Sequence, residues 1–105
     1  MFGLQKTDIE VIQRMLEQFN EIEKAFIFGS RAIGNFKKGS DIDIAVSGKN
    51  INENTLTKLF TLLNEESPLP YFFDLLHYEE ISNSELKMHI DNFGVEIYNN
   101  KTSIV

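Results

Sequence analysis

Cysteine and tryptophan are absent from this sequence of 105 residues, and proline occurs only twice. The lack of cysteine excludes disulfides, thiol nucleophiles and zinc sites built on thiolates. No apolar run approaches the roughly 20 residues that a membrane helix needs, and residues 1–5 have neither a basic segment nor the long apolar segment of a signal peptide. We therefore expect a protein of the cytoplasm.

Positive charge is also scarce, because 10 Lys and Arg stand against 16 Asp and Glu, for a net charge of −6. Affinity for nucleic acids comes mainly from Lys and Arg that neutralise phosphates, so direct nucleic-acid binding is not expected. A small local anion site stays possible. Nine Phe and three Tyr are enough to build a core, and we expect residues 1–105 to form a single domain.

The spacing of apolar residues predicts both helices and strands. Helical spacing occurs over about residues 8–20, from Asn52 or Asn54 to a stop at Pro68, and over 84–93. Capping boxes beginning at Thr7 and Ser82 indicate two of the helix starts. Short apolar or alternating runs over 25–28, 41–46, 71–76 and 95–98 predict strands. The predicted fold is α/β (α+β), with a mixed sheet of about four strands packed with three main helices.

Two aspartates, Asp41 and Asp43, stand two residues apart in the second predicted strand. Side chains at this spacing point to one face, so Ile42, Ile44 and Val46 would point to the core on the other face. Paired carboxylates repel each other unless a cation lies between them, and they suit Mg²⁺. The alternative is that Asp41 caps a turn and Asp43 lies on a solvated sheet face.

Asp74 lies inside the apolar run 71–76, where its neighbours favour burial. Burying an unpaired carboxylate is costly, so this residue needs a partner. It could be a third metal ligand that also accepts a proton from an attacking hydroxyl, and we expect it to converge with Asp41 and Asp43 on a shared ion. It could instead accept backbone N–H groups, or face water from an edge strand.

The Gly29-Ser30 pair directly follows the first predicted strand and could open a short helical turn. Glycine lets a phosphate approach the backbone, the serine hydroxyl and free N–H groups donate to phosphate oxygens, and Arg31 adds a charged fork. Residues 24–40 carry a charge of +4, whereas the remainder carries −10. The alternative is an exposed turn with solvated lysines. We interpret His77 as a residue of the surface or one that supports the metal ligands from behind, and His89 as structural.

With Phe28-Gly29-Ser30-Arg31-Ala32, then residues 39–46 and Asp74, the sequence resembles the DNA polymerase beta-type nucleotidyltransferase superfamily. It is most similar to the minimal nucleotidyltransferases (MNT), the antitoxins of HEPN/MNT toxin–antitoxin pairs. The resemblance spans about residues 24–98 and implies the polymerase beta-like fold.

The resemblance also implies roles for individual residues. Gly29 and Ser30 would hold the phosphates of a nucleoside triphosphate, with help from Arg31 and Ser40. Asp41, Asp43 and Asp74 would bind two Mg²⁺ ions, and Asp74 would help to deprotonate the acceptor. Many relatives have a second arginine where this sequence has Ile33, which Lys37 or Lys38 would have to replace.

The implied function is the transfer of AMP from ATP to a hydroxyl, with a tyrosine of a cognate HEPN-domain toxin as the expected acceptor. Because 105 residues leave no room for an added acceptor-binding domain, we expect the site to be completed in a homo- or hetero-oligomer. Two alternatives stay open. The protein could neutralise its HEPN partner by occlusion alone, or it could modify a small hydroxylated molecule.

Overall fold

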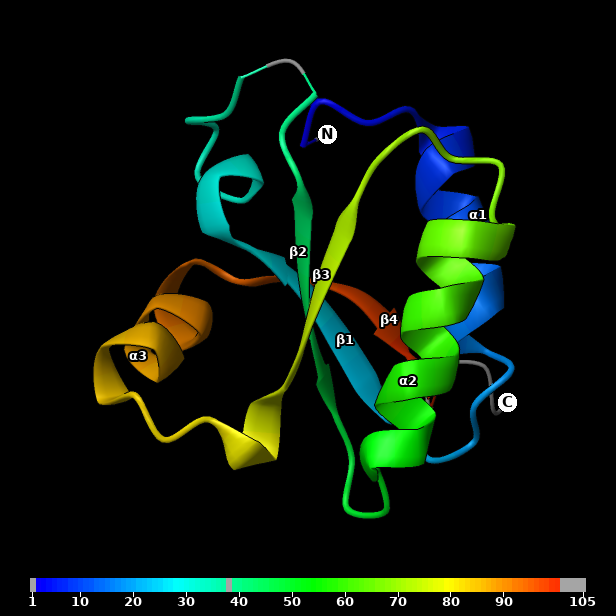
Figure 1. The fold of residues 1–105 in the computed structure, drawn as a ribbon. Helices are drawn as coiled ribbons and strands as arrows, with labels where there is room; N and C mark the ends of the chain where they lie inside the picture. Colours follow the sequence, from blue (N-terminus) through cyan, green and yellow to red (C-terminus); the bar gives the residue numbers. More distant parts are fainter. Residues whose placement is uncertain (1, 38, 101–105) are drawn as a thin grey trace.

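The computed structural model describes residues 2–37 and 39–100, which form a four-stranded sheet with helices on both faces (Figure 1). The strands are β1 (Lys24–Phe28), β2 (Ile42–Ser47), β3 (Phe73–His77) and β4 (Val95–Asn99). The helices are α1 (Lys6–Leu16), α2 (Glu53–Thr61), which continues into a π-helical turn (Leu62–Glu66), and α3 (Ser84–Phe93). The predicted fold class and order of elements are confirmed.

The sheet is mixed, with the spatial order β3-β2-β1-β4. Strand β1 runs antiparallel to both β2 and β4, whereas β2 and β3 are parallel. The register places Phe28 opposite Asp43, and Asp43 opposite Asp74. One row across three strands therefore carries two adjacent aspartates, at the end of the sheet where β1 ends and β2 and β3 begin.

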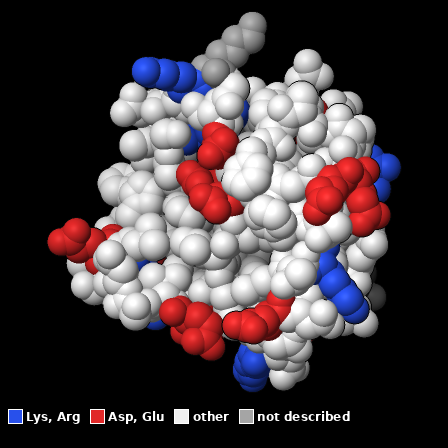
Figure 2. Space-filling model, in the orientation of Figure 1, with Lys and Arg blue, Asp and Glu red and all other residues white. Residues whose placement is uncertain are grey.

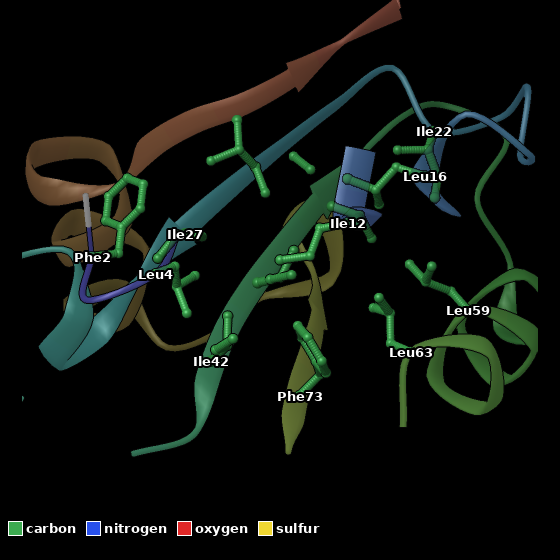
Figure 3. Close-up of a cluster of buried hydrophobic side chains, with 14 of the residues drawn as sticks. Phe2, Leu4, Ile12, Leu16, Ile22, Ile27, Ile42, Leu59, Leu63 and Phe73 are labelled. Carbon is green, nitrogen blue, oxygen red and sulfur yellow. The ribbon is translucent and has the colours of Figure 1, made fainter. Parts of the chain in front are cut away.

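The larger core cluster joins one face of the sheet to α1 and α2 (Figure 3). Ile42, Ile44 and Val46 of β2 are fully buried in it, as the alternating pattern predicts. The two helices bury a stripe of aliphatic side chains against these strands, which includes Ile12, Leu16, Leu59 and Leu63. This face of the sheet is closed.

On the opposite face lies α3, which packs through a smaller cluster that contains Phe28, Ala45 and Ile90, joined by Tyr78 and Ile81 from the segment before α3 (Figure 1). Because side chains alternate along a strand, Asp43 lies on this face together with Ala45. Asp43 is half-buried and Asp74 is exposed. A single helix therefore leaves this face accessible at the end where the two aspartates lie.

Two helix starts differ from the prediction. Helix α1 is preceded by Gln5 as its N-cap rather than by Thr7. The side chain of Asn83, rather than that of Ser82, accepts the first backbone N–H groups of α3. At α1 the Asp8 carboxylate accepts the Gln5 N–H, whereas at α3 the side chain of Asn83 satisfies the N–H groups that the helix leaves unpaired. Asn52, one of two predicted candidates, caps α2.

Candidate functional site

Asp43 and Asp74 form the centre of the candidate site. Their Cα atoms are partners on the parallel strands β2 and β3, and Asp41 lies exposed just before β2. Figure 2 shows acidic side chains over the beginning of these strands. Within residues 2–37 and 39–100, none of the three carboxylates takes part in a hydrogen bond or ion pair. The site is therefore a group of anions that no described donor or cation neutralises.

The exposure of Asp74 corrects one interpretation of the sequence. The apolar run around it predicted a buried carboxylate, but the side chain is exposed, and that of the adjacent Phe72 is 48 % exposed. The reason is that Asp74 points to the face of the sheet that carries the smaller cluster, whereas Phe73 of the same strand points into the larger core and is fully buried. Asp74 thus faces water from an edge strand, as one alternative stated, and its role as a metal ligand stays a prediction.

The environment of Asp43 favours a cation. Burial raises the pKa of its carboxyl group, and the nearby negative charges of Asp74 and Asp41 raise this pKa further. A carboxylate in this position gains by binding positive charge. The adjacent pair also fits the way proteins bind Mg²⁺, through one or two carboxylates together with substrate phosphates.

The convergence of all three carboxylates on one ion is not found. The described part of the chain contains no group of three or more His, Asp or Glu side chains that could hold a metal ion. Repulsion between neighbouring carboxylates opposes such a grouping. Asp43 and Asp74 are thus neighbours in the sheet, whereas the role of Asp41 as a third ligand stays a prediction.

The turn after β1 packs directly against Asp43. Residues Gly29–Arg31 form a 3₁₀ turn, as predicted. Gly29 has a φ of +77°, and a Cβ atom there would lie 2.3 Å from Oδ2 of Asp43, so only glycine fits without strain or displacement. The half-buried Ser30 hydroxyl makes no hydrogen bond with another described residue. The turn therefore carries a hydroxyl without a described hydrogen-bond partner, one residue after the glycine that packs against Asp43.

Arg31 is buried, with only 3 % of its surface exposed. Its Nε and Nη2 atoms donate to the carbonyl oxygen of Ser40 at 3.1 and 2.7 Å, and Nη1 donates to that of Phe2 at 2.8 Å. The guanidinium also lies over the rings of Phe36 and Tyr71. These contacts hold the loop that leads into β2, and a phosphate contact by Arg31 would require some of them to break.

Ser40 is likewise engaged with its own loop. Its hydroxyl group donates to the carbonyl oxygen of Lys37 and accepts the N–H of the same residue at 3.0 Å. These bonds, together with the hydrogen bonds from Arg31 to its carbonyl oxygen, fix the orientation of Ser40 directly before Asp41. Phosphate binding by Ser40 stays a prediction, whereas its contact with the loop is observed.

The basic residues of segment 24–40 do not form one surface. Lys24 begins β1 and therefore lies at the end of the sheet opposite to Gly29, and Arg31 is buried. Lys37 is exposed on the loop, and Lys38 lies outside the described residues. The charge of segment 24–40 therefore overstates how much positive charge lies beside the aspartates. Residues at the two ends of a strand are close in the sequence but far apart in space.

His89 belongs to this site, although the sequence interpretation made it structural. Its Nε2 atom accepts the backbone N–H of Gly29 at 3.0 Å, and its ring packs against those of Phe28 and Phe93. A signal for this placement exists, because His89 shares the apolar face of α3 with Leu86 and Phe93. A polar ring on that face is expected to contact the sheet, but the sequence does not indicate which residue of the sheet it contacts.

His77 lies at the other end of β3, away from Asp74. Its Nε2 atom is 3.2 Å from a carboxylate oxygen of Glu79, without the alignment of a hydrogen bond. It also lines a groove of about 820 Å³ between α2, β3 and the segment leading into α3. The residues lining this groove do not include the three aspartates, so the groove and the candidate site are separate features.

The chain matches a known protein family over a range that includes the residues of the candidate site. The model of the family described as "Polymerase beta, Nucleotidyltransferase" matches residues 10–103, a range that contains the Gly29 turn and all three aspartates. No curated protein sequence matches the chain. None of the described helices is both long and apolar enough to cross a membrane.

Several solved structures have a similar fold. One is a toxin–antitoxin with AMP-PNP, with a TM-score of 0.72 and 21% identity over 91% of this chain and 77% of that chain. Another is the toxin–antitoxin MntA-HepT, with a TM-score of 0.69 and 20% identity over 94% and 76%. A third is the tri-AMPylated Shewanella oneidensis HEPN toxin in complex with its MNT antitoxin, with a TM-score of 0.69 and 20% identity over 95% and 76%. Identities this low indicate a shared fold.

Proposed function

Because this chain belongs to the polymerase beta nucleotidyltransferase family, we propose that it transfers AMP from ATP to a hydroxyl group in a Mg²⁺-dependent reaction. The acceptor in this proposal is a tyrosine of a HEPN-domain toxin, and the chain is the antitoxin that inactivates it in the cytoplasm. The observation that carries the proposal is the pair of neighbouring carboxylates, Asp43 and Asp74, of which Asp43 packs directly against Gly29 of the Gly29–Arg31 turn.

In this proposal the carboxylates of Asp41, Asp43 and Asp74 hold two Mg²⁺ ions. When bound, these ions supply positive charge that offsets the triphosphate and the carboxylates. The Ser30 hydroxyl donates a hydrogen bond to a phosphate oxygen, and Gly29 lets the phosphate approach the backbone. The carboxylates of the chain are thus left unpaired because their partner is a cation that arrives with the nucleotide.

The exposed carboxylate of Asp74 is suited to receive the proton of the acceptor. The acceptor oxygen forms a bond to the α-phosphorus, the bond from that phosphorus to the oxygen of the β-phosphate breaks, and pyrophosphate leaves. The proton of the hydroxyl passes to Asp74. A large acceptor such as a protein can reach this residue because β3 is an edge strand.

The similar solved structures support the choice of acceptor. One contains a HEPN toxin that carries AMP in complex with an MNT antitoxin, and another is a toxin–antitoxin with the ATP analogue AMP-PNP. The shared fold makes a HEPN-domain protein the first acceptor to test. A complex of the two proteins would also be the hetero-oligomer expected from the sequence.

The test is an AMP-transfer assay with ATP, Mg²⁺ and a candidate HEPN-domain protein, sought first among the genes next to the one that encodes this chain. Mass spectrometry should detect one or more added adenylyl groups on tyrosine, and Asp41→Asn should abolish them. As a matched control, Glu80→Gln removes an exposed carboxylate away from the site and should leave transfer unchanged. No adenylyl group on the HEPN protein with wild-type enzyme would contradict the proposal.

A binding-only antitoxin is the second candidate, and it is favoured by the lack of a three-ligand metal group among the described side chains. The double variant Asp41→Asn/Asp43→Asn distinguishes the two functions. If it still neutralises the toxin fully, occlusion is sufficient. Transfer to a small hydroxylated molecule can be tested in the same assay, with labelled ATP and a panel of acceptors in place of the protein.

A further inference from the structure

We propose that His89 is a positioning residue for the phosphate-binding turn, and that it acts by holding the backbone N–H of Gly29 from helix α3. This inference rests on the proposed function, because it assigns a role in binding triphosphate at that turn. It adds a residue outside the acidic and Gly-Ser motifs. The two partners lie 60 residues apart in the sequence.

The hydrogen bond fixes the state of the ring. The N–H of Gly29 points at Nε2 of His89 across 3.0 Å, and a nitrogen that accepts a hydrogen bond carries no proton. His89 is therefore assigned as a neutral imidazole with its proton on Nδ1. Its ring is held from two sides, by an edge-on contact with Phe28 and a tilted contact with Phe93, at centroid distances of 6.3 and 5.5 Å.

Gly29 is thereby confined by two contacts. Asp43 leaves no room for a side chain on its Cα atom, and Nε2 of His89 accepts its N–H group. A glycine with positive φ has wide backbone freedom, and these two contacts remove it. The direction of the following residue, Ser30, depends on them, so His89 aims the free Ser30 hydroxyl without touching the phosphate.

The alternative is that His89 only anchors α3 to the sheet. Its neighbours Leu86 and Ile90 already pack α3 onto that face through the smaller core cluster. A purely structural residue would affect stability and all ligands alike. A positioning residue for the phosphate-binding turn would affect the affinity for ligands that have β- and γ-phosphates more than the affinity for ligands that lack them. The two roles therefore differ in a binding measurement.

The experiment compares His89→Ala and His89→Gln in the full chain, because the side-chain carbonyl of glutamine can again accept an N–H group. Met88→Ala is the matched control, since it truncates an exposed neighbour on the same helix. Affinities for AMP-PNP and for AMP are measured by calorimetry with Mg²⁺. Thermal melting verifies that each variant is folded.

We expect His89→Ala to weaken AMP-PNP binding about 5- to 30-fold, the effect of leaving one N–H group without its acceptor. AMP affinity should change by less than about twofold, His89→Gln should recover part of the loss, and Met88→Ala should bind like the wild type. Nuclear magnetic resonance gives an independent readout. The Gly29 amide signal should shift in His89→Ala, and the wild-type ¹⁵N spectrum should show Nε2 without a proton.

The outcomes separate the inference from the proposed function. If the wild type binds AMP-PNP and His89→Ala binds equally well, or loses AMP to the same extent, the positioning role is wrong while the proposed function stands. A protonated Nε2 in the wild type would also overturn it. If the wild type binds no AMP-PNP, the proposed function fails and the inference fails with it.

Discussion

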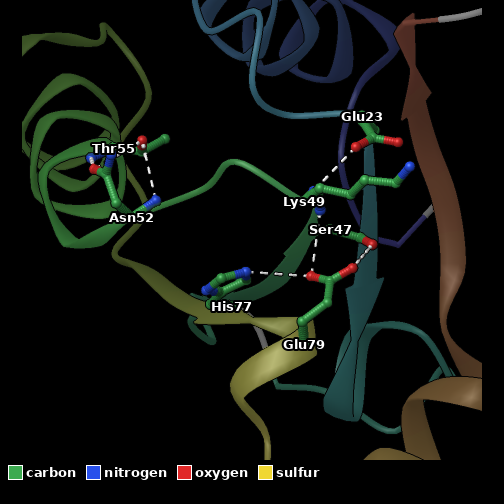
Figure 4. Close-up of polar contacts among 8 residues, drawn as sticks. Glu23, Ser47, Lys49, Asn52, Thr55, His77 and Glu79 are labelled. Atoms are coloured by element: carbon green, nitrogen blue, oxygen red, sulfur yellow. Dashed lines mark hydrogen bonds and ion pairs between the residues drawn. The ribbon is translucent and has the colours of Figure 1, made fainter.

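The two ends of the sheet treat acidic side chains in opposite ways. Where β1 begins and β2 ends, acids are paired with donors: Glu79 accepts the Ser47 hydroxyl and the Gly48 N–H (Figure 4). Burial acts to raise the pKa of Glu79, but these bonds, its own N–H and His77 outweigh it and leave the pKa below its usual value. Nearby, a hydrogen bond from Thr55 lowers the pKa of Glu21.

At the other end, Asp43 lies among carboxylates, and its pKa is raised by burial and by Asp74 and Asp41. An acid with a lowered pKa, such as Glu79, stabilises the fold when it is ionised. An acid with a raised pKa, such as Asp43, destabilises the fold when it is ionised. Acids without local partners therefore mark a place where the fold is less stable than it could be, which is common at functional sites. Substitutions at the two ends should therefore have opposite effects.

The largest effect is expected for Asp43→Asn. Transfer of AMP should fall more than about 100-fold, because a proposed metal ligand is lost, while the melting temperature at pH 7 should rise. A carboxyl group with a raised pKa in the folded state destabilises the protein when ionised, and this penalty disappears as the pH falls through that pKa. Thermal melts between pH 7 and pH 3 test this, since the two proteins should converge in acid. A lower melting temperature for the variant at pH 7 would contradict the comparison.

Gly29→Ala should have the next largest effect. Its φ of +77° costs an alanine about 1–2 kcal/mol, and the clash with Asp43 adds to this. Gly34→Ala is a closely matched control, because Gly34 has a φ of +79° but no atom within 4 Å of the added Cβ. In urea unfolding Gly29→Ala should be the less stable of the two, and it alone should lose AMP-PNP binding. Equal losses in both variants would show that the contact with Asp43 is unimportant.

The smallest effect is expected at the opposite end, for Glu79→Gln. The loss of charged hydrogen bonds to Ser47 and Gly48 should lower the free energy of unfolding by about 1 kcal/mol at pH 7, without affecting AMP transfer. A lowered folded-state pKa contributes stability above the usual value of 4.5 and loses it as the pH falls below that value. The difference from wild type should therefore vanish near pH 3 in urea unfolding. Glu80→Gln, which changes the exposed neighbour, should behave like wild type throughout.

Local patterns predicted the elements of this fold well, because alternation and helical spacing act within a few residues. Ile42, Ile44 and Val46 were assigned to the core from alternation, and all three are fully buried. The exposure of Asp74 could not be predicted in this way. It depends on which elements cover each face of β3, because Phe73 of the same strand is fully buried, and that cover results from packing between distant segments.

The candidate site was predicted in part for the same reason. The motif assigned Gly29, Asp43 and Asp74 to one site. In the structure Asp43 lies beside both of the others. The contacts of Arg31 with Phe2 and of His89 with Gly29 join residues far apart in the sequence, and no spacing rule encodes them. Motifs identify residue types that suit a chemistry, whereas the partners of each side chain follow from the whole fold.

The row Phe28–Asp43–Asp74 also has a consequence for folding. Its members come from three strands, and the parallel pairing of β2 with β3 forms only after the chain has crossed over through α2. Non-local pairings of this kind form slowly, because the chain must close long loops first. A chain in which β3 has not yet paired with β2 therefore lacks the row, and the acidic pair comes into existence when β3 docks. A nascent chain would be unable to bind the nucleotide until that step is complete.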